Sequence, residues 1–176
     1  MLSLRSMTEV DLPQVEAWLR QPHVARWWTA DTTAETTIDS YRRRLTGQKS
    51  RTHMLVATED GTAIGWCQWY LWADYPAEAL AMQAAEGEVG IDYAIGELTR
   101  TGRGVGTRLI EALVAEVRRI HPGAGMLVDP DAANLASRRV LEKNGFVLVA
   151  VPRVDTEPND APMSIYRLPA VVGGNC

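Results

Sequence analysis

The sequence Thr101-Gly102-Arg103-Gly104-Val105-Gly106-Thr107 joins a strand pattern to a helix pattern. Before it, residues 89–95 form an apolar, strand-like run, and after it apolar residues recur at helical spacing from Val105 to Val117. Alternating glycines let backbone amides approach one object, and the N-terminus of the following helix adds partial positive charge. We therefore predict that this loop binds a phosphate or a pyrophosphate.

The glycine spacing excludes two common nucleotide-binding loops. A Walker A loop requires Gly-Lys followed by Ser or Thr, and the dinucleotide fingerprint requires a further glycine or alanine near Leu109. The sequence has neither pattern. On the loop alone, a tight strand-to-helix turn without a ligand remains an equal alternative.

Upstream of the loop, the sequence predicts short strands and helices. We expect a strand at 2–5, a helix that ends before Pro22, an aromatic linker at 23–28 and a helix at 34–45. A β-hairpin follows, with strands at 53–58 and 63–72 around Glu59-Asp60-Gly61. Residues 73–88 are predicted to be either a short helix or a loop.

Downstream of the loop, the pattern has a β-α-β character. We expect a strand at 126–128, a helix at 134–143, and an antiparallel pair at 146–151 and 163–168 around a polar loop at 155–160. Together with the upstream elements, this order predicts a mixed α/β (α+β) fold.

The composition is typical of one globular domain. The chain has 176 residues, 46% of them apolar and 23% charged, so we expect a single domain at 1–170 and a flexible tail at 171–176. The apolar runs are too short to span a bilayer, and the N-terminus lacks the basic, apolar and small-residue regions of a secretory signal. These two features predict a cytoplasmic protein.

The cysteines and the net charge bear on possible ligands. Cys67 and Cys176 have no partners at metal-ligand spacing, so we expect neither a disulfide nor a metal. The net charge of −4 weakly favours a cationic small molecule over nucleic acid.

Motifs further along the chain add to the loop. Asp129-Pro130 ends a strand pattern, Asn134-Leu135 starts a helix pattern, and Leu141-Glu142-Lys143-Asn144-Gly145-Phe146 closes it. With the glycine loop, these motifs resemble the GCN5-related N-acetyltransferase (GNAT) family. The resemblance implies a mostly antiparallel mixed sheet flanked by helices, with acetyl-CoA held where two central strands splay apart. Thr101 stands where the family usually has Gln or Arg, which implies less charge assistance in the loop.

Within this family, the chain is similar to the aminoglycoside 6'-N-acetyltransferases. The further motifs that carry this similarity are Trp27-Trp28, Gly65-Trp66-Cys67-Gln68 and Gly90-Ile91-Asp92. The similarity implies acetyl-CoA-dependent acetylation of an aminoglycoside antibiotic, at the 6'-amine, by a cytoplasmic monomer or homodimer that confers resistance. An acetyltransferase for another small amine or a peptide N-terminus, a non-catalytic acyl-CoA sensor and a nucleotide-binding protein remain alternatives.

The resemblance assigns a catalytic role to Asp92. An amine acceptor is protonated at neutral pH, so the enzyme must hold the cation and accept its proton, and a carboxylate can do both. A purely electrostatic role and a surface position at a strand end are the alternatives for Asp92. The family's usual Tyr before the Glu-Lys motif is Leu141 here, so the general acid stays open, with Tyr93 and Tyr166 as candidates.

The predicted binding residues form two sets. The set predicted to bind the cofactor is Tyr93, Ala94, Ile95, Thr101, Gly102, Arg103, Gly104, Val105, Gly106, Thr107 and Asn134. The set predicted to bind the acceptor is Trp27, Trp28, Asp74, Asp92 and Asp129, with Glu88 as a further acidic candidate. Each carboxylate has a solvated surface position as its ordinary alternative, and each tryptophan a half-buried core position.

Overall fold

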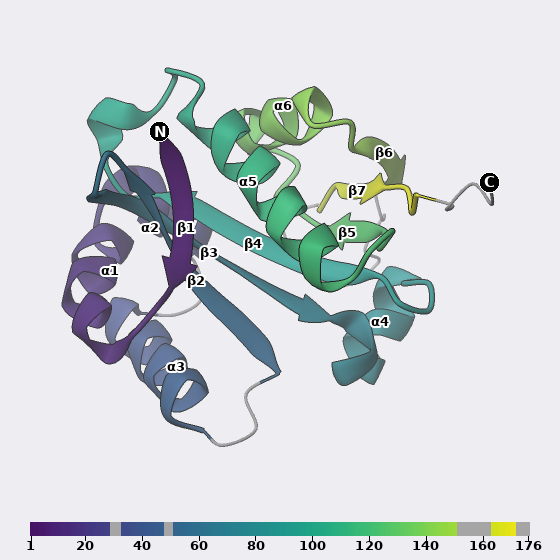
Figure 1. Cartoon of the computed structure of the whole chain (residues 1–176), viewed down its shortest axis with the longest axis horizontal. Helices are drawn as coiled ribbons and strands as arrows, with labels where there is room; N and C mark the ends of the chain where they lie inside the picture. Colours follow the sequence, from purple (N-terminus) through teal and green to yellow (C-terminus); the bar gives the residue numbers. More distant parts are fainter. Residues whose placement is uncertain (29–32, 48–50, 151–162, 172–176) are drawn as a thin grey trace.

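The fold is built on a sheet whose strands come from both halves of the chain (Figure 1). The computed structural model describes residues 1–28, 33–47, 51–150 and 163–171. Within these residues, seven strands form a single sheet in the order β1-β2-β3-β4-β5-β7-β6. Their bounds are β1 Leu2–Ser6, β2 Thr52–Glu59, β3 Thr62–Leu71, β4 Val89–Ile95, β5 Met126–Val128, β6 Val147–Ala150 and β7 Ile165–Leu168.

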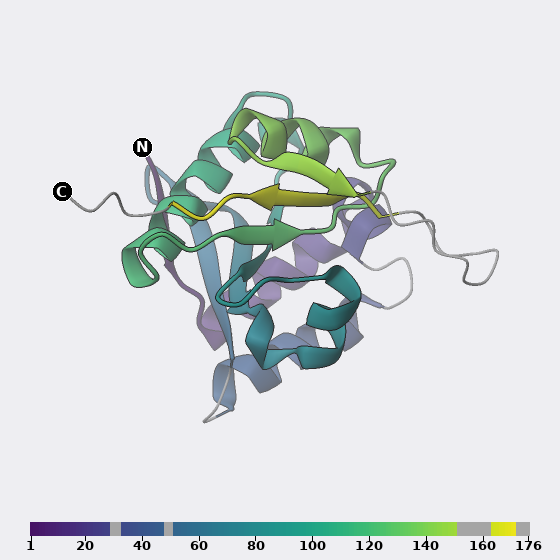
Figure 2. The same cartoon turned by 90° about the vertical axis from the view of Figure 1, so that its right-hand side faces the viewer.

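Two central strands separate part of the way along their length. The neighbouring strands pair antiparallel except β4 and β5, which run parallel. Their register holds only at Val89 with Met126 and Gly90 with Leu127. Beyond Gly90 and Leu127 the two strands no longer pair with each other. Figure 2 shows β5, β7 and β6, green to yellow, side by side in the C-terminal part of the sheet. The predicted mixed sheet with a central splay is confirmed.

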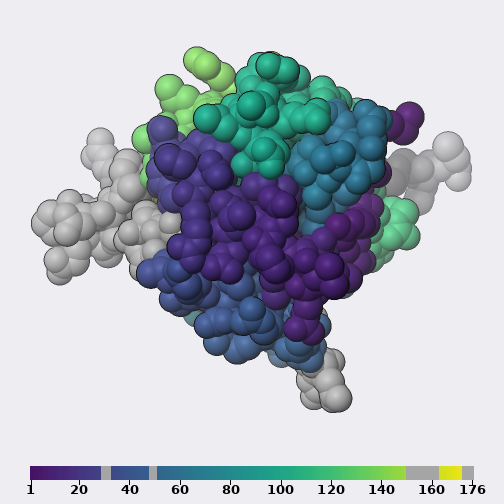
Figure 3. All heavy atoms as spheres, turned by 90° about the vertical axis from the view of Figure 1, so that its left-hand side faces the viewer, coloured from purple at the N-terminus to yellow at the C-terminus, as the bar shows by residue number. Residues whose placement is uncertain are grey.

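Helices cover both faces of the sheet. Their bounds are α1 Leu12–Leu19, α2 Pro22–Trp28, α3 Ala34–Thr46, α4 Pro76–Met82, α5 Val105–Ile120 and α6 Leu135–Lys143. Figure 3 shows the N-terminal helices, purple to blue, lying together over one side of the molecule. None of the helices in the described ranges is long and apolar enough to cross a membrane.

The two faces follow from the two-residue period of β2 and β3. Leu55, Ala57 and Cys67 point to one face and pack with the buried stripe of α5. The alternate residues Val56 and Trp66 point to the other face and pack with α1 and α3. Each face therefore carries its own core.

The structure confirms the clearest sequence patterns. The hairpin turn lies at Asp60 and Gly61, both with positive φ. The stripe of α5 is buried, and α5 begins after Gly104, whose φ is +76°. The antiparallel pair of β6 and β7 also forms, whereas the predicted loop at 155–160 lies outside the described residues.

One segment differs from its prediction, and a second segment, for which a helix and a loop were both open, contains a helix. The expected linker at 23–28 is the helix α2, because Pro22 starts a helical turn in which the amides of Val24 and Ala25 donate to the carbonyl of Gln21. The ambiguous segment 73–88 contains the short helix α4, which ends at Gln83 in a left-handed conformation. Of the predicted tail, residues 172–176 lie outside the described residues.

Candidate active site

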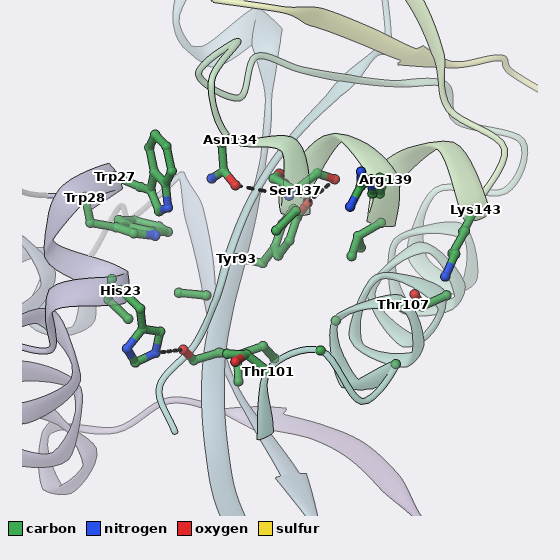
Figure 4. Close-up of a pocket in the computed structure, with 18 residues that line it drawn as sticks. His23, Trp27, Trp28, Tyr93, Thr101, Thr107, Asn134, Ser137, Arg139 and Lys143 are labelled. Atoms are coloured by element: carbon green, nitrogen blue, oxygen red, sulfur yellow. Dashed lines mark hydrogen bonds between the residues drawn. The ribbon is translucent and has the colours of Figure 1, made fainter. Parts of the chain in front are cut away.

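A first cavity lies in front of the glycine loop, and we call it the loop cavity. It has a volume of about 350 Å³ and is enclosed by α2, β4, the glycine loop and α6 (Figure 4). Of the predicted residues, those that line it are Trp27, Trp28, Tyr93, Ala94, Ile95, Thr101, Gly102, Gly104, Gly106, Thr107 and Asn134. The structure thus brings together almost the whole predicted cofactor set.

The backbone of the glycine loop fits an anion. Gly102 and Gly104 have φ of +70° and +76°, values that favour glycine. Gly104 directly precedes α5, whose first amides lack partners within the helix. Arg103 is exposed and Val105 is buried, so neither side chain lines the cavity. Their predicted contribution is through backbone amides.

Two basic residues that the sequence analysis missed face the glycine loop from α6. Arg139 and Lys143 line the loop cavity (Figure 4). Their spacing of four residues places them on one helix face, which is the signal that could have identified them. Positive charge near the loop is therefore supplied by α6, although Thr101 replaces the usual polar or basic residue of the loop motif.

Tyr93 is held at the centre of the loop cavity. Its hydroxyl lies 2.6 Å from the Oγ of Ser137, and the side chain of Asn134 accepts from the amide of Ser137. Burial raises the pKa of Tyr93 and keeps its hydroxyl protonated. His23, another residue that the sequence did not identify, faces the same cavity and hydrogen-bonds the carbonyl of Ile95 at 3.0 Å.

A second cavity, the carboxylate cavity, lies at the splay of β4 and β5. It has a volume of about 440 Å³ and is lined by Arg44, Thr52, Gln68, Tyr70, Trp72, Tyr75, Glu78, Ala81, Met82, Asp92 and Asp129. Asp92 and Tyr93 are consecutive on β4 and therefore point to opposite sides of the strand. One strand thus contributes to both cavities.

Asp92 and Asp129 reach the carboxylate cavity from the two separating strands. Burial raises the pKa of Asp92, while a 2.7 Å hydrogen bond from the Nε2 of Gln68 to its Oδ2 lowers it. Burial, and secondly the charge of Asp92, raise the pKa of Asp129 to about 6. Carboxylates in such surroundings can hold an ammonium group and accept a proton near neutral pH.

Aromatic side chains also line the carboxylate cavity and pack against one another. The ring of Tyr70 meets Trp72 edge-on at 5.3 Å and Tyr75 at 5.1 Å between ring centroids. Glu78 from α4 adds a third carboxylate to the lining. Tyr75 and Glu78 were missed, because their segment gave no clear pattern in the sequence.

The other predicted acceptor residues lie elsewhere. Trp27 and Trp28 line the loop cavity, and Trp28 also packs on Trp66 at 5.2 Å. Asp74 lies 3.7 Å from the Nε of Arg51 and is outside the lining of the carboxylate cavity. Glu88 is buried in an ion pair of 2.7 Å with Arg167 and lies outside the lining of the carboxylate cavity.

The candidate general acids differ in whether they line a cavity. Leu141 is fully buried in the core, and its aliphatic side chain has no proton that it could donate. Tyr166 is also fully buried, accepts from the Nε of Arg138 and donates to Glu142. Of the two candidate tyrosines, Tyr93 is the one that lines a cavity. In the described part of the chain, no group of three or more His, Cys, Asp or Glu residues could hold a metal ion.

Known proteins resemble the chain in sequence. The model of the family described as "Acetyltransferase (GNAT) domain" matches residues 7–153. The aminoglycoside N(6')-acetyltransferase type 1 of Klebsiella pneumoniae is 30% identical over 148 residues, which is 82% of this chain and 73% of that protein. The lysine N-acyltransferase MbtK of Mycobacterium tuberculosis is 28% identical over 170 residues, or 95% of this chain and 77% of that protein.

Solved structures share the fold. The aminoglycoside acetyltransferase AAC(6')-Ib in complex with coenzyme A is 28% identical and superposes with a TM-score of 0.78, covering 96% of this chain and 95% of that one. Its complex with coenzyme A and kanamycin is 27% identical, with a TM-score of 0.77 over 96% of this chain and 95% of that one. These neighbours bind coenzyme A in an architecture that this chain reproduces.

Proposed function

Because the chain belongs to the GNAT acetyltransferase family, we propose that it transfers the acetyl group of acetyl-CoA to an aminoglycoside, at its 6'-amine. The loop cavity would hold the cofactor, with its pyrophosphate on the amides of the glycine loop and next to Arg139 and Lys143. The carboxylate cavity would hold the acceptor. In a resistant cell, such a reaction would remove a positive charge from the antibiotic.

One observation favours an aminoglycoside as the acceptor. Asp92, Asp129 and Glu78 come from three separate elements and line one cavity with an aromatic wall. Several carboxylates favour a polycation, and aromatic faces suit both sugar rings and ammonium groups. A peptide acceptor would need no such concentration of acidic groups.

In the proposed reaction, Asp92 accepts a proton from the acceptor ammonium. Acetyl-CoA supplies an electrophilic thioester carbonyl, which a neutral amine attacks. The raised pKa of Asp92 makes it a better base than an exposed carboxylate, and Asp129 would hold a second ammonium group. Tyr93, on the other side of the strand, would supply the proton for the leaving thiolate.

A second candidate is the acylation of another amine. The lysine N-acyltransferase MbtK covers more of this chain than the aminoglycoside enzyme does, at nearly the same identity. Lysine carries one carboxylate, and Arg44 gives the carboxylate cavity one cation that could pair with it. The acceptor must therefore be decided by direct comparison.

The experiment measures release of the CoA thiol with kanamycin, spermidine, lysine and a peptide amine tested separately. We expect kanamycin to be the preferred acceptor, and Asp92→Asn to lower kcat/KM at least about tenfold. Asp74→Asn is the matched control, because this carboxylate lies outside the cavity lining. Turnover with lysine alone would replace the acceptor, and tight CoA binding without turnover would indicate an acyl-CoA sensor.

A further inference from the structure

A chain of hydrogen bonds crosses three elements to reach Asp92. Arg44 on α3 donates from Nη1 to the Oε1 of Gln68 on β3 at 2.9 Å. Gln68 then donates from Nε2 to the Oδ2 of Asp92 on β4 at 2.7 Å. Gln68 and Asp92 are direct cross-strand partners in the β3–β4 register. The three side chains therefore form one connected path along the carboxylate cavity.

The chemistry of Arg44 fixes the orientation of the Gln68 amide. A guanidinium can only donate hydrogen bonds, so the oxygen of the amide must face Arg44 and its NH₂ must face Asp92. Without Arg44, the amide could turn its oxygen toward Asp92. An amide oxygen only accepts hydrogen bonds, so Asp92 could then bond to it only in the protonated form. Gln68 is 6% exposed, so water has little access to replace either partner.

Arg44 is itself held in place. Its guanidinium lies 5.5 Å from the centre of the Tyr41 ring, and the hydroxyl of the buried Tyr41 accepts from the Nε1 of Trp66. Among the described residues, no carboxylate lies within ion-pair distance of Arg44. Arg44 is thus directed at Gln68 and the cavity, with no acidic partner from the surface of its own helix.

We propose that Arg44 is a positioning residue that acts through Gln68 to hold Asp92 ionised, with Oδ1 turned to the acceptor amine. The inference rests on the role of Asp92 under the proposed function. In this proposal, Arg44 contacts neither the acetyl donor nor the proton that is transferred. Arg44 would set the protonation state and direction of the base, and would not perform catalysis.

The other charged and titratable groups around Asp92 do not replace Arg44. Asp129 after β5 and Glu78 on α4 share the cavity, and their negative charges oppose ionisation of Asp92. Tyr41 on α3, Tyr70 on β3 and the adjacent Tyr93 have pKa values that burial raises, so they are neutral near pH 7. Arg44 is therefore the positive group that favours the ionised form of Asp92 from within the cavity lining.

The test compares Arg44→Leu, Gln68→Leu and the double variant with Arg44→Lys and Arg43→Leu. Arg43 is the matched control, because it is the same residue type, one position away on α3, and exposed. Carboxyl ¹³C NMR follows the titration of Asp92 in the acceptor-free protein, and kcat/KM is measured against pH with the preferred amine. Circular dichroism confirms that each variant is folded.

We expect Arg44→Leu and Gln68→Leu each to raise the titration midpoint of Asp92 and the acidic limb of the pH profile by about one pH unit, or roughly tenfold in proton affinity. The double variant should shift little further than either single one, because both residues act on one path. Arg44→Lys should recover part of the wild-type profile, and Arg43→Leu should match the wild type.

Two results would overturn the proposal. One is an unchanged Asp92 midpoint in Arg44→Leu. The other is a rise in acceptor KM alone, additive with Gln68→Leu, which would mean that Arg44 binds the acceptor directly. A shifted midpoint with full activity in Asp92→Asn would support the hydrogen-bonded path and contradict the proposed base, so the two hypotheses fail in different ways.

Discussion

At the scale of single residues, Asp129 makes stability depend on pH. Its pKa is about 6 in the folded protein because of burial and the neighbouring charge of Asp92, against about 4 in an unfolded chain. Between these values the folded protein holds a proton that the unfolded chain has lost. Raising the pH through this window therefore lowers the free energy of unfolding.

Asp129→Asn should remove this loss. We expect the variant to be more stable than the wild type at pH 7.5, by at most about 3 kcal/mol, and no more stable at pH 4. Urea unfolding at the two pH values measures the difference. Equal stabilities at pH 7.5 would show that solvent or a counter-charge compensates the buried carboxylate. If Asp129 also binds the acceptor, the stabilised variant should lose activity.

The carboxylate of Glu88 serves the fold. Its Oε1 pairs with Arg167 on β7 at 2.7 Å, and its Oε2 accepts from the amide of Ala85. The Glu88 side chain is 8% exposed and that of Arg167 is 33% exposed. Removing one partner of a buried pair leaves the other charge without compensation, at a cost of several kcal/mol when both are fully buried.

Glu88→Gln should therefore lower the free energy of unfolding by about 2 kcal/mol, below the fully buried range because Arg167 keeps some contact with water. The control is Glu86→Gln, an exposed carboxylate two residues away that should change stability by less than about 0.5 kcal/mol. Chemical unfolding of the two variants decides the matter. A loss of activity at unchanged stability in Glu88→Gln would contradict this structural role and support Glu88 as an acceptor ligand.

At the scale of elements, the glycine loop and the hairpin turn each contain a glycine with positive φ, so the effect of backbone strain can be compared with the effect on ligand binding. Gly102 and Gly61 both have positive φ, +70° and +81°, and a Cβ at either position would meet no atom within 4 Å. An alanine costs about 1 kcal/mol or more at each, because left-handed backbone disfavours a side chain. Only Gly102 faces the loop cavity.

We expect Gly102→Ala to weaken CoA binding about tenfold, since relaxing the strain moves the amides that would hold the pyrophosphate. Gly61→Ala should lose similar stability and bind CoA as the wild type does. Isothermal titration calorimetry with CoA gives both affinities. Equal binding by the two variants would mean that the loop is only a tight turn.

The elements also show where sequence reasoning succeeds. The helix α5 and the β2–β3 hairpin were predicted because their periodicity and turn residues are local signals. The sequence predicts a linker where the helix α2 lies, since these seven residues carry Trp27 and Trp28 and lack a clear apolar stripe. Short helices such as α4 depend on packing that no local pattern records.

The same distinction applies to the site. The glycine loop and Asp92 were identified from motifs, and the structure places both at cavities. Arg44 and Glu78 were missed, because their approach to Asp92 depends on how α3 and α4 pack against the sheet. A single sequence indicates which residues have suitable chemistry, but tertiary contacts decide which of them meet.

At the scale of the whole molecule, the loop cavity joins distant parts of the chain. Its lining comes from α2 near the N-terminus, β4 and the glycine loop in the middle, and α6 toward the C-terminus. Figure 1 shows that these elements, which are far apart in the sequence, meet at one place in the fold. A ligand bound in the loop cavity would therefore contact all of them at once. Binding to the folded state alone must therefore stabilise the molecule by mass action.

We expect CoA at about 100 times its dissociation constant to add about 2.7 kcal/mol of stability and to raise the melting temperature by about 5–10 °C. ATP at the same concentration should raise it less, because ATP shares the adenosine and phosphates of CoA but lacks the pantetheine arm that would reach Tyr93. Differential scanning fluorimetry measures both shifts, with Gly102→Ala as the variant in which the CoA shift should shrink. A larger shift with ATP would mean that the glycine loop serves a nucleotide, and would remove the basis for assigning the loop cavity to acetyl-CoA.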